Sequence, residues 1–115
     1  MAVPQLPQLQ DAEFDPVVRA EQTPVVVEFY SPLCPPCRRI APIVVEIARE
    51  YAGRLRFVQV NAMQSPDLTR RFRVAGVPTM VILSRGQGIG RIVGEMPRET
   101  LTARLDEALA RVPQA

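Results

Sequence analysis

Residues 25–37 read VVVEFYSPLCPPC, and this stretch decides the fold of the 115-residue chain. Its first six residues are β-branched or aromatic apart from Glu28, a nearly continuous apolar run that is typical of a strand buried on both faces. Prolines end the run, and apolar residues then recur at three- and four-residue steps over residues 40–51, which indicates a helix. The stretch therefore predicts a central strand that leads into a helix, with Cys34 and Cys37 at the junction.

The position of the cysteines at a helix start has a chemical consequence. The first turn of a helix presents unpaired N–H groups and the positive end of the helix dipole, which stabilise a thiolate. We therefore expect Cys34 to have a lowered pKa and to attack disulfides, and Cys37, one turn further on, to resolve the mixed disulfide. Pro35 and Pro36 fit the first turn but lack N–H groups, so the Cys37 amide is the nearest local donor to the Cys34 sulfur.

The rest of the chain predicts alternating strands and helices. In chain order these are a short strand before residue 11, a helix at 12–20 capped by Asp11, a strand at 25–30, a helix ending at Gly53, a strand at 55–60, a helix at 66–72 capped by Ser65, strands at 79–83 and 89–93 joined by a glycine-containing loop, and a helix at 97–109. The order β-α-β-α-β-α-β-β-α predicts an α/β fold, with a central mixed sheet of four to five strands and helices on both faces.

Length and composition fit a single globular domain over residues 1–115, with residues 1–7 and 112–115 as flexible tails. The formal net charge is +2, and no basic run supports nucleic-acid binding. The N-terminus lacks the basic and apolar segments of a secretory signal, and no apolar stretch is long enough to cross a membrane. We therefore expect a soluble, cytoplasmic monomer that acts away from nucleic acid and membranes.

Two other interpretations of the cysteine pair stay open. A tetrahedral zinc site needs four ligands, so a chain with two cysteines and no histidine would have to dimerise or use carboxylates to supply them. The cysteines would alternatively be inert buried thiols, although prolines and Arg38-Arg39 flank them. A lone Cys-x-x-Cys pair in a cytosolic protein is more often catalytic or metal-binding than a structural staple, so exchange chemistry is the favoured hypothesis.

Several spaced motifs resemble the thioredoxin family. They are residues 28–38 (EFYSPLCPPCR), Pro42, residues 76–79 (GVPT) and Val93-Gly94, with Pro78 following Cys37 by 41 positions. The similarity extends over roughly residues 8–110. It implies a thioredoxin-like fold and a protein-disulfide oxidoreductase that cycles its Cys34–Cys37 pair between dithiol and disulfide without a cofactor.

The resemblance also implies a client-binding groove around the cysteines. Pro78 would follow a cis peptide bond and lie beside the cysteines, which leaves the Val77 backbone free to pair with an extended client segment. The residues that it implies for contact with the client are Leu33, Pro35, Pro36, Val77, Pro78, Thr79 and Gly94.

Glu28 stands where the family has a buried aspartate. Burial would raise its pKa and make it a candidate to take and return the Cys37 proton. The alternative is that Glu28 reaches a sheet edge or an arginine and is merely solvated. Gln59 stands where the family usually has a lysine, so the customary charge partner of the acid is missing.

The resemblance implies oxidised client proteins and a thioredoxin reductase as partners of a thioredoxin-type reductant. Tyr30 and Leu33 replace the usual tryptophans and Pro35 replaces a glycine, so a specialised oxidase or isomerase with its own partner stays open. A further alternative is a binding module that holds a partner in the groove and whose cysteines only report redox state. The direction of electron flow is not set by sequence, because about 30 mV changes the two-electron equilibrium tenfold.

Overall fold

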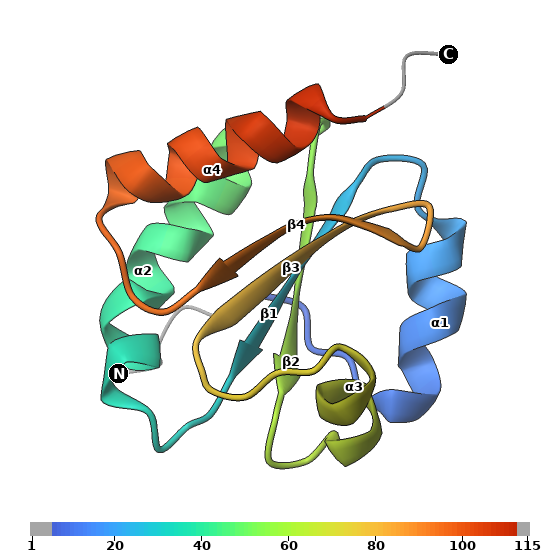
Figure 1. Ribbon diagram of the computed structural model, residues 1–115, viewed down its shortest axis with the longest axis vertical. Coiled ribbons are helices and arrows are strands. Elements are labelled where there is room, and N and C mark those ends of the chain that lie inside the picture. The colour runs from blue at the N-terminus through green and yellow to red at the C-terminus, as the bar shows by residue number, and fades with distance from the viewer. Residues whose placement is uncertain (1–5, 113–115) are drawn as a thin grey trace.

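The computed structural model describes residues 6–112 and contains four helices and four strands (Figure 1). In chain order they are α1 (Asp11–Ala20), β1 (Val25–Tyr30), α2 (Pro35–Glu50), β2 (Arg56–Asn61), α3 (Pro66–Arg71), β3 (Thr79–Ser84), β4 (Gln87–Val93) and α4 (Arg98–Ala110). These ranges agree closely with the predicted ones. One predicted element, the strand before residue 11, is not among them.

The four strands form one mixed sheet in the order β2-β1-β3-β4. β1 runs parallel to β2 and antiparallel to β3, and β4 runs antiparallel to β3. Helices α2 and α4 lie against one face of this sheet, and α1 and α3 lie against the other (Figure 1). The result is the α/β sandwich with helices on both faces that the pattern predicts.

Two hydrophobic clusters fill the spaces between the sheet and the helices, and β1 contributes to both. Alternate residues of a strand point to opposite faces, so Val26 packs with α2 and α4 whereas Val27 and Phe29 pack with α1 and α3. The first five residues of β1 are buried, and Glu28 is one of them. The strand that leads to the cysteines is therefore fixed on both faces as well as along both edges.

The predicted first strand is reduced to a single bridge at the outer edge of β2. Gln8 pairs with Gln59 in a parallel bridge. The Gln59 N–H donates to Pro7 O (2.8 Å), and the Leu9 N–H donates to Gln59 O (2.8 Å). Pro7 has no N–H with which to extend the ladder, and α1 begins at Asp11. The segment is therefore too short and too poor in donors to form a strand.

Residues 6 and 7, predicted as part of the N-terminal tail, belong to the fold. Leu6 is buried in the cluster under α2 and α4, and Pro7 accepts a hydrogen bond from β2, so both residues are part of the fold. After α4, the Val112 N–H donates to Leu109 O (3.1 Å) in a turn. The other residues predicted as tails, 1–5 and 113–115, lie outside the described residues.

The N-terminal cap of α1 differs from the prediction, whereas the cap residue of α3 is Ser65, as predicted. Asp11 is the first residue of α1, and its cap is Gln10. The Asp11 carboxylate instead reaches α3, where it accepts hydrogen bonds from the N–H groups of Leu68 (3.1 Å) and Asp67 (3.4 Å). Ser65 occupies the cap position of α3, but its hydroxyl is buried and makes no hydrogen bond to any residue that the structure describes. An acid from α1 therefore supplies the acceptors that cap α3.

Arginine side chains cover part of the outer edge of β4. Arg111 donates to Ile89 O (2.9 Å), and Arg104 donates to Arg91 O (2.9 Å). Arg104 lies in α4 and Arg111 directly follows that helix. Carbonyls two positions apart on a strand point the same way, so the two guanidinium groups occupy acceptors that a further strand would use.

We predict that Asp11→Ala lowers the free energy of unfolding by roughly 1 kcal/mol, because it removes the side-chain acceptor that caps α3. Ser65→Ala is the matched control, since it removes a hydroxyl that is buried without a partner and should cost little. Urea denaturation of both variants measures the difference. Equal losses in the two variants would show that Asp11 does not act as the cap.

Candidate active site

The two cysteines lie where β1 gives way to α2. Cys34 is the N-cap of α2 and Cys37 lies in its first turn, and the two form a disulfide with their Cα atoms 5.2 Å apart. Ser31 shapes the loop before the helix, because its carbonyl accepts from the Cys34 N–H (3.2 Å) and its hydroxyl accepts from the Leu33 N–H (3.1 Å). These two hydrogen bonds turn the chain so that Cys34 stands at the helix start.

The sulfur of Cys34 faces the amino end of α2. The Cys37 N–H points at Cys34 Sγ at 3.2 Å and is the local donor that the sequence predicts. Pro35 and Pro36 fill the first two helical positions and offer no N–H. The first turn of α2 holds no acidic side chain, so the helix dipole acts on the sulfur unopposed. A negative charge on Cys34 Sγ is stabilised in this arrangement.

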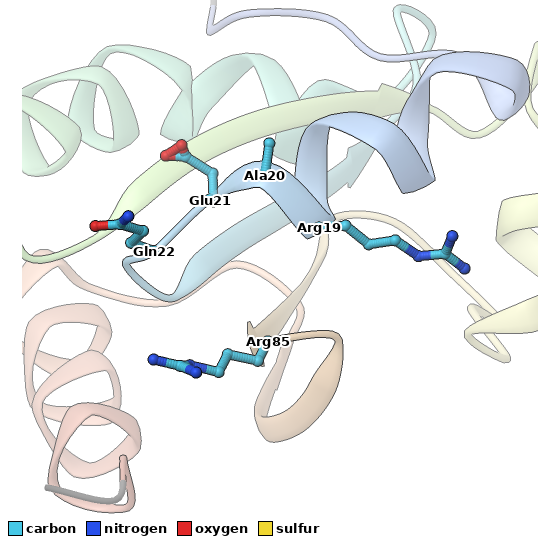
Figure 2. Close-up of a pocket in the computed structure, with 5 residues that line it drawn as sticks. All are labelled: Arg19, Ala20, Glu21, Gln22 and Arg85. Carbon is cyan, nitrogen blue, oxygen red and sulfur yellow. The ribbon is translucent and has the colours of Figure 1, made fainter. Parts of the chain in front are cut away.

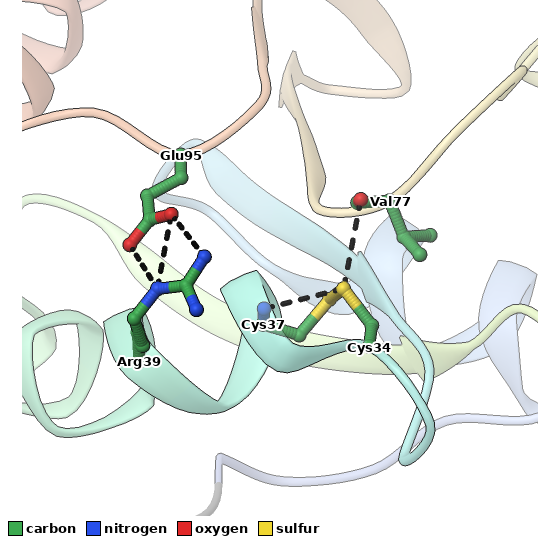
Figure 3. Close-up of polar contacts among 5 residues, drawn as sticks. All are labelled: Cys34, Cys37, Arg39, Val77 and Glu95. Atoms are coloured by element: carbon green, nitrogen blue, oxygen red, sulfur yellow. Dashed lines mark hydrogen bonds and ion pairs between the residues drawn. A yellow bond between two sulfur atoms is a disulfide. The ribbon is translucent and has the colours of Figure 1, made fainter.

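The loop before β3 lies directly beside the disulfide. The Val77–Pro78 peptide bond is cis, as the resemblance implies, and Val77 O lies 3.6 Å from Cys34 Sγ (Figure 3). The Gly94 N–H donates to Pro78 O (2.8 Å), which brings the end of β4 to the same place. Thr79 is buried and its hydroxyl closes a turn within the loop, so its side chain shapes the loop from inside.

Exposed apolar side chains lie at the end of the sheet where the cysteines are. Among the described residues, the large hydrophobic side chains that stand exposed are Leu33 (73%), Met63 (62%) and Val93 (61%). Leu33 directly precedes Cys34, Val93 ends the strand beside the cis-proline loop, and Met63 Sδ accepts a hydrogen bond from Ser31 Oγ (3.2 Å). Apolar surface concentrated at one place is typical of a site that contacts other proteins.

An ion pair fixes the end of β4 to α2 close to the cysteines. Arg39 Nε donates to Glu95 Oε2 (2.9 Å) and its Nη2 donates to Oε1 (2.8 Å), and Figure 3 shows the pair beside the disulfide. These hydrogen bonds lower the pKa of Glu95. Both side chains are exposed, so the pair orders the loop after Gly94 more than it stabilises the fold.

Glu28 is buried beneath the cysteine helix rather than solvated. It is 2% exposed and lies in register between Gln59 on β2 and Met80 on β3. Gln59 Nε2 donates to Glu28 Oε1 (2.8 Å), and Oε2 has no hydrogen-bond partner among the described residues. Burial raises the pKa of Glu28, and the hydrogen bond from Gln59 opposes that rise in part. The alternative in which an arginine or solvent holds this carboxylate is therefore wrong.

A surface hollow at the opposite end of the sheet has a different character. It is lined by Arg19, Ala20, Glu21, Gln22 and Arg85, which lie at the end of α1, in the segment that follows it and in the β3–β4 turn (Figure 2). The side chains of Arg19 and Arg85 extend in different directions, so they do not converge on a shared ligand. Within residues 6–112, no three His, Cys, Asp or Glu side chains gather as a metal ion would need. The disulfide region is the candidate active site.

Comparison with known proteins bears directly on this site. The family model described as Thioredoxin matches residues 5–107. The chain belongs to the thioredoxin family. Thioredoxin M4, chloroplastic, of Arabidopsis thaliana is 38% identical over 94% of this chain and 56% of its own length. Thioredoxin of Synechocystis sp. is 36% identical over 90% of this chain and 96% of its own length, and Thioredoxin 1 of Nostoc sp. is 36% identical over 89% and 95%. The chain thus spans about half the length of the Arabidopsis relative.

Membership of the thioredoxin family makes the chain a thiol-disulfide oxidoreductase, with the Cys34–Cys37 pair as its redox centre. Thioredoxins act on oxidised client proteins and are themselves reduced by a reductase. No helix in the described part of the chain is long and apolar enough to span a membrane.

Met63 and Gln8 were not singled out from the sequence, and Val93 was named only as part of the Val93-Gly94 motif. Val93 follows the buried Ile92 at the end of β4, so the alternation along that strand could have marked Val93 as an exposed position. Met63 lies in the turn after β2 and Gln8 in the segment before α1, where no periodic pattern marks either residue.

We predict that the oxidised protein loses stability as pH rises above about 5, because Glu28 must ionise while buried. A carboxyl whose pKa is raised by folding from its ordinary value near 4.5 stabilises the fold below that value, and this contribution is lost as pH rises through the folded pKa. Few other groups titrate there, because the chain has no histidine and its cysteines are in a disulfide.

Glu28→Gln is the test, since the amide keeps an acceptor for Gln59 but cannot ionise. Urea denaturation at about pH 5 and about pH 8 should show a smaller decline for the variant than for the wild type. The variant should also be the more stable protein at the higher pH. Two parallel pH profiles would contradict a raised pKa at Glu28.

Proposed function

We propose that this chain acts as a reductant of disulfides in oxidised client proteins, with Cys34 as the attacking nucleophile. The observation that carries the proposal is the hydrogen bond of the Cys37 N–H to Cys34 Sγ (3.2 Å) at the start of α2. That N–H and the helix dipole favour a thiolate on Cys34 in the reduced protein. The thiolate is the form of cysteine that attacks a disulfide.

The proposed cycle transfers two electrons from the cysteine pair to the client. The Cys34 thiolate attacks one client sulfur and the other client sulfur leaves as a thiolate, which forms a mixed disulfide. The Cys37 thiolate then attacks Cys34 Sγ and releases the second client thiolate. The products are the Cys34–Cys37 disulfide and a reduced client, and we propose that a thioredoxin reductase returns the pair to the dithiol.

Glu28 is the proposed acceptor of the Cys37 proton. It lies on β1, and Val26, two positions earlier on the same strand, packs against the face of α2. Burial raises the pKa of Glu28 above that of an ordinary carboxyl, which suits a group that takes a proton and later returns it. The same burial keeps solvent from competing for that proton.

The client is proposed to bind on the surface beside the disulfide, at the cis-proline loop and the nearby exposed apolar side chains. Val77 O lies 3.6 Å from Cys34 Sγ, so a client strand paired with the Val77 backbone would bring its sulfur to the nucleophile. The proposed client contacts there are Leu33, Pro35, Pro36, Val77, Pro78, Thr79 and Gly94, and two hydrogen bonds order this part of the chain, from the Gly94 N–H to Pro78 O and from the Thr79 hydroxyl to Gly76 O. We add Met63 and Val93 to the apolar contacts because of their exposure.

A cytoplasmic location and a monomeric state are also proposals. The Arabidopsis relative is named as chloroplastic, whereas the Synechocystis and Nostoc relatives carry no compartment in their names. Cell fractionation and analytical ultracentrifugation test the two proposals directly.

We predict a reduction potential for Cys34–Cys37 near about −270 mV, as for thioredoxin-type reductants. The measurement is equilibration in glutathione buffers, followed by alkylation of free thiols and mass analysis. A value near about −120 to −180 mV would instead identify an oxidase or isomerase. If no redox transition is found, the proposed enzymatic activity is wrong, and the chain would instead be a module that binds a partner protein.

We also predict that Cys37→Ser accumulates a mixed disulfide with client proteins, because Cys34 can attack but nothing resolves the product. Cys34→Ser is the matched control and should accumulate little, since Cys37 lies inside the first turn of α2. Non-reducing electrophoresis after incubation with an oxidised protein reads out both. Trapping by the Cys34→Ser variant alone would reverse the assigned roles.

A further inference from the structure

The carboxyl of Glu28 lies in the layer between the sheet and the helix that carries the cysteines. Met80, its neighbour in register on β3, and Val26, two positions earlier on β1, both belong to the hydrophobic cluster under α2. Residues two apart on a strand share a face, so Glu28 points to that side. Cys37 is buried one helical turn before Ile40, which packs into the same cluster. Glu28 and Cys37 therefore lie in the same layer. A group that orients the Glu28 carboxyl can affect the transfer of the Cys37 proton to it.

Three side chains form an ordered line of hydrogen bonds that ends on this carboxyl. The Tyr30 hydroxyl donates to Gln8 Oε1 (2.8 Å), and Gln8 Nε2 donates to Gln59 Oε1 (2.9 Å). Gln59 Nε2 then donates to Glu28 Oε1 (2.8 Å). Each donor in the line points toward the buried acid.

The backbone delivers Gln8 to its place in the line. Hydrogen bonds on either side of it, from the Gln59 N–H to Pro7 O (2.8 Å) and from the Leu9 N–H to Gln59 O (2.8 Å), hold residues 7–9 against the edge of β2. The pairing puts the side chains of Gln8 and Gln59 next to each other. The single bridge that replaces the predicted first strand therefore serves the site.

The direction of the line follows from the chemistry of the amide group. A glutamine side chain has one acceptor oxygen and one donor nitrogen, so a donor placed on the oxygen turns the nitrogen to the other side. With Tyr30 donating to Gln8, the amide nitrogen of Gln8 faces Gln59, and that of Gln59 faces Glu28. One N–H is thus committed to Glu28 Oε1, while Oε2 has no hydrogen-bond partner within the described chain.

Among residues 6–112, no charged side chain is found to act on Glu28. The groups that face Glu28 are Gln59 from β2, Met80 from β3 and the apolar side chains of α2 around Ile40. The titratable groups nearby are the Cys37 thiol on α2 and the Tyr30 hydroxyl at the end of β1. In these neutral surroundings a single N–H is the interaction that favours the ionised carboxylate.

We propose that Gln59 is a positioning residue: its N–H, held on Oε1 of Glu28, reserves Oε2 for the proton of Cys37. Gln8 and Tyr30 keep Gln59 in that orientation. The proposal rests on the role of Glu28 proposed above. In the step concerned, a proton moves from Cys37 Sγ to Glu28 Oε2, the Cys37 thiolate bonds to Cys34 Sγ, and the bond from that sulfur to the client breaks. The client sulfur leaves as a thiolate with the electron pair of that bond.

The first test measures the ionisation of Glu28 itself in the oxidised protein, where the cysteines do not titrate. The probe is the carboxyl-carbon NMR shift of Glu28 followed against pH in Gln59→Leu, Gln8→Leu and Tyr30→Phe. The midpoint should rise by about one to two pH units in Gln59→Leu, which corresponds to one hydrogen bond to a charged group. Smaller rises are expected in Gln8→Leu and Tyr30→Phe, in that order, because these residues act through Gln59.

A matched control separates positioning from a general loss of stability. Tyr51→Phe removes the other tyrosine hydroxyl of the chain, which donates to Asp106 Oδ1 (2.7 Å) and touches no member of the line. It should leave the Glu28 midpoint unchanged. Gln59→Lys should move the midpoint in the opposite direction from Gln59→Leu, because a cation favours the ionised carboxyl.

The second test follows the pH profile of client release from a preformed mixed disulfide with Cys34. Its midpoint should move with that of Glu28 in every variant. If the Glu28 midpoint moves but the release profile does not, Glu28 is not the proton acceptor and the proposed function loses that step. If Gln59→Leu and Tyr30→Phe lower stability equally at all pH values and leave the Glu28 midpoint in place, the line is only structural and the positioning proposal is overturned. If Gln59→Leu does not fold, the Glu28 midpoint in Tyr30→Phe still tests whether the line of hydrogen bonds is only structural.

Discussion

The hydrogen bond from the Cys37 N–H to the Cys34 sulfur is the contact on which the rest of the site depends. It exists because α2 starts at a fixed point, and that point is fixed by β1, an inner strand paired with β2 on one side and β3 on the other. Both faces of β1 are covered by hydrophobic clusters, so the strand cannot shift without exposing one of them. The hydrogen bonds of Ser31 in the short loop after β1 thus fix the position of the Cys34 sulfur relative to the sheet.

The pairing of the strands also places the cis-proline loop and the end of β4 near the Cys34 sulfur. β3 pairs with β1, so the residues just before β3 lie level with the residues just after β1. The N–H of Gly94 on the Pro78 carbonyl then brings the next strand end to the same place, and the ion pair of Arg39 with Glu95 holds it against α2. Segments far apart in sequence meet here because they are the ends of neighbouring strands.

The sequence predicted those parts that depend on local pattern. The apolar run at 25–30, the helix that follows it and the Cys-x-x-Cys spacing are each visible within a dozen residues, and the structure has all of them. Ser65 is the N-cap of α3 as predicted, but the side-chain acceptors for that helix come from Asp11, which reaches it from 56 positions away and is marked by no local signal. Gln8 was hidden for the same reason, since its partner Gln59 is 51 positions away. Pairings of this kind have no periodicity and become visible only in the folded chain.

A buried carboxyl without a charged partner works against the stability of the fold. Such a group breaks the pattern of an otherwise apolar strand, and breaks of this kind are expected at functional positions. In β1 this break is limited to Glu28, whose carboxylate accepts a hydrogen bond from the neutral amide of Gln59. The strand around it keeps its register with β2 and β3.

The guanidinium groups that sit on the outer carbonyls of β4 affect how this molecule meets other chains. An exposed strand edge invites any extended polypeptide, including a second copy, to dock by backbone hydrogen bonds alone. Arg104 and Arg111 occupy two of the outer carbonyls of β4, so another strand is less able to pair with this edge. The client contact proposed at the Val77 backbone is a separate place, beside Cys34 Sγ. Contact there does not require a client strand to extend the sheet at β4, whose carbonyls at Ile89 and Arg91 already accept hydrogen bonds.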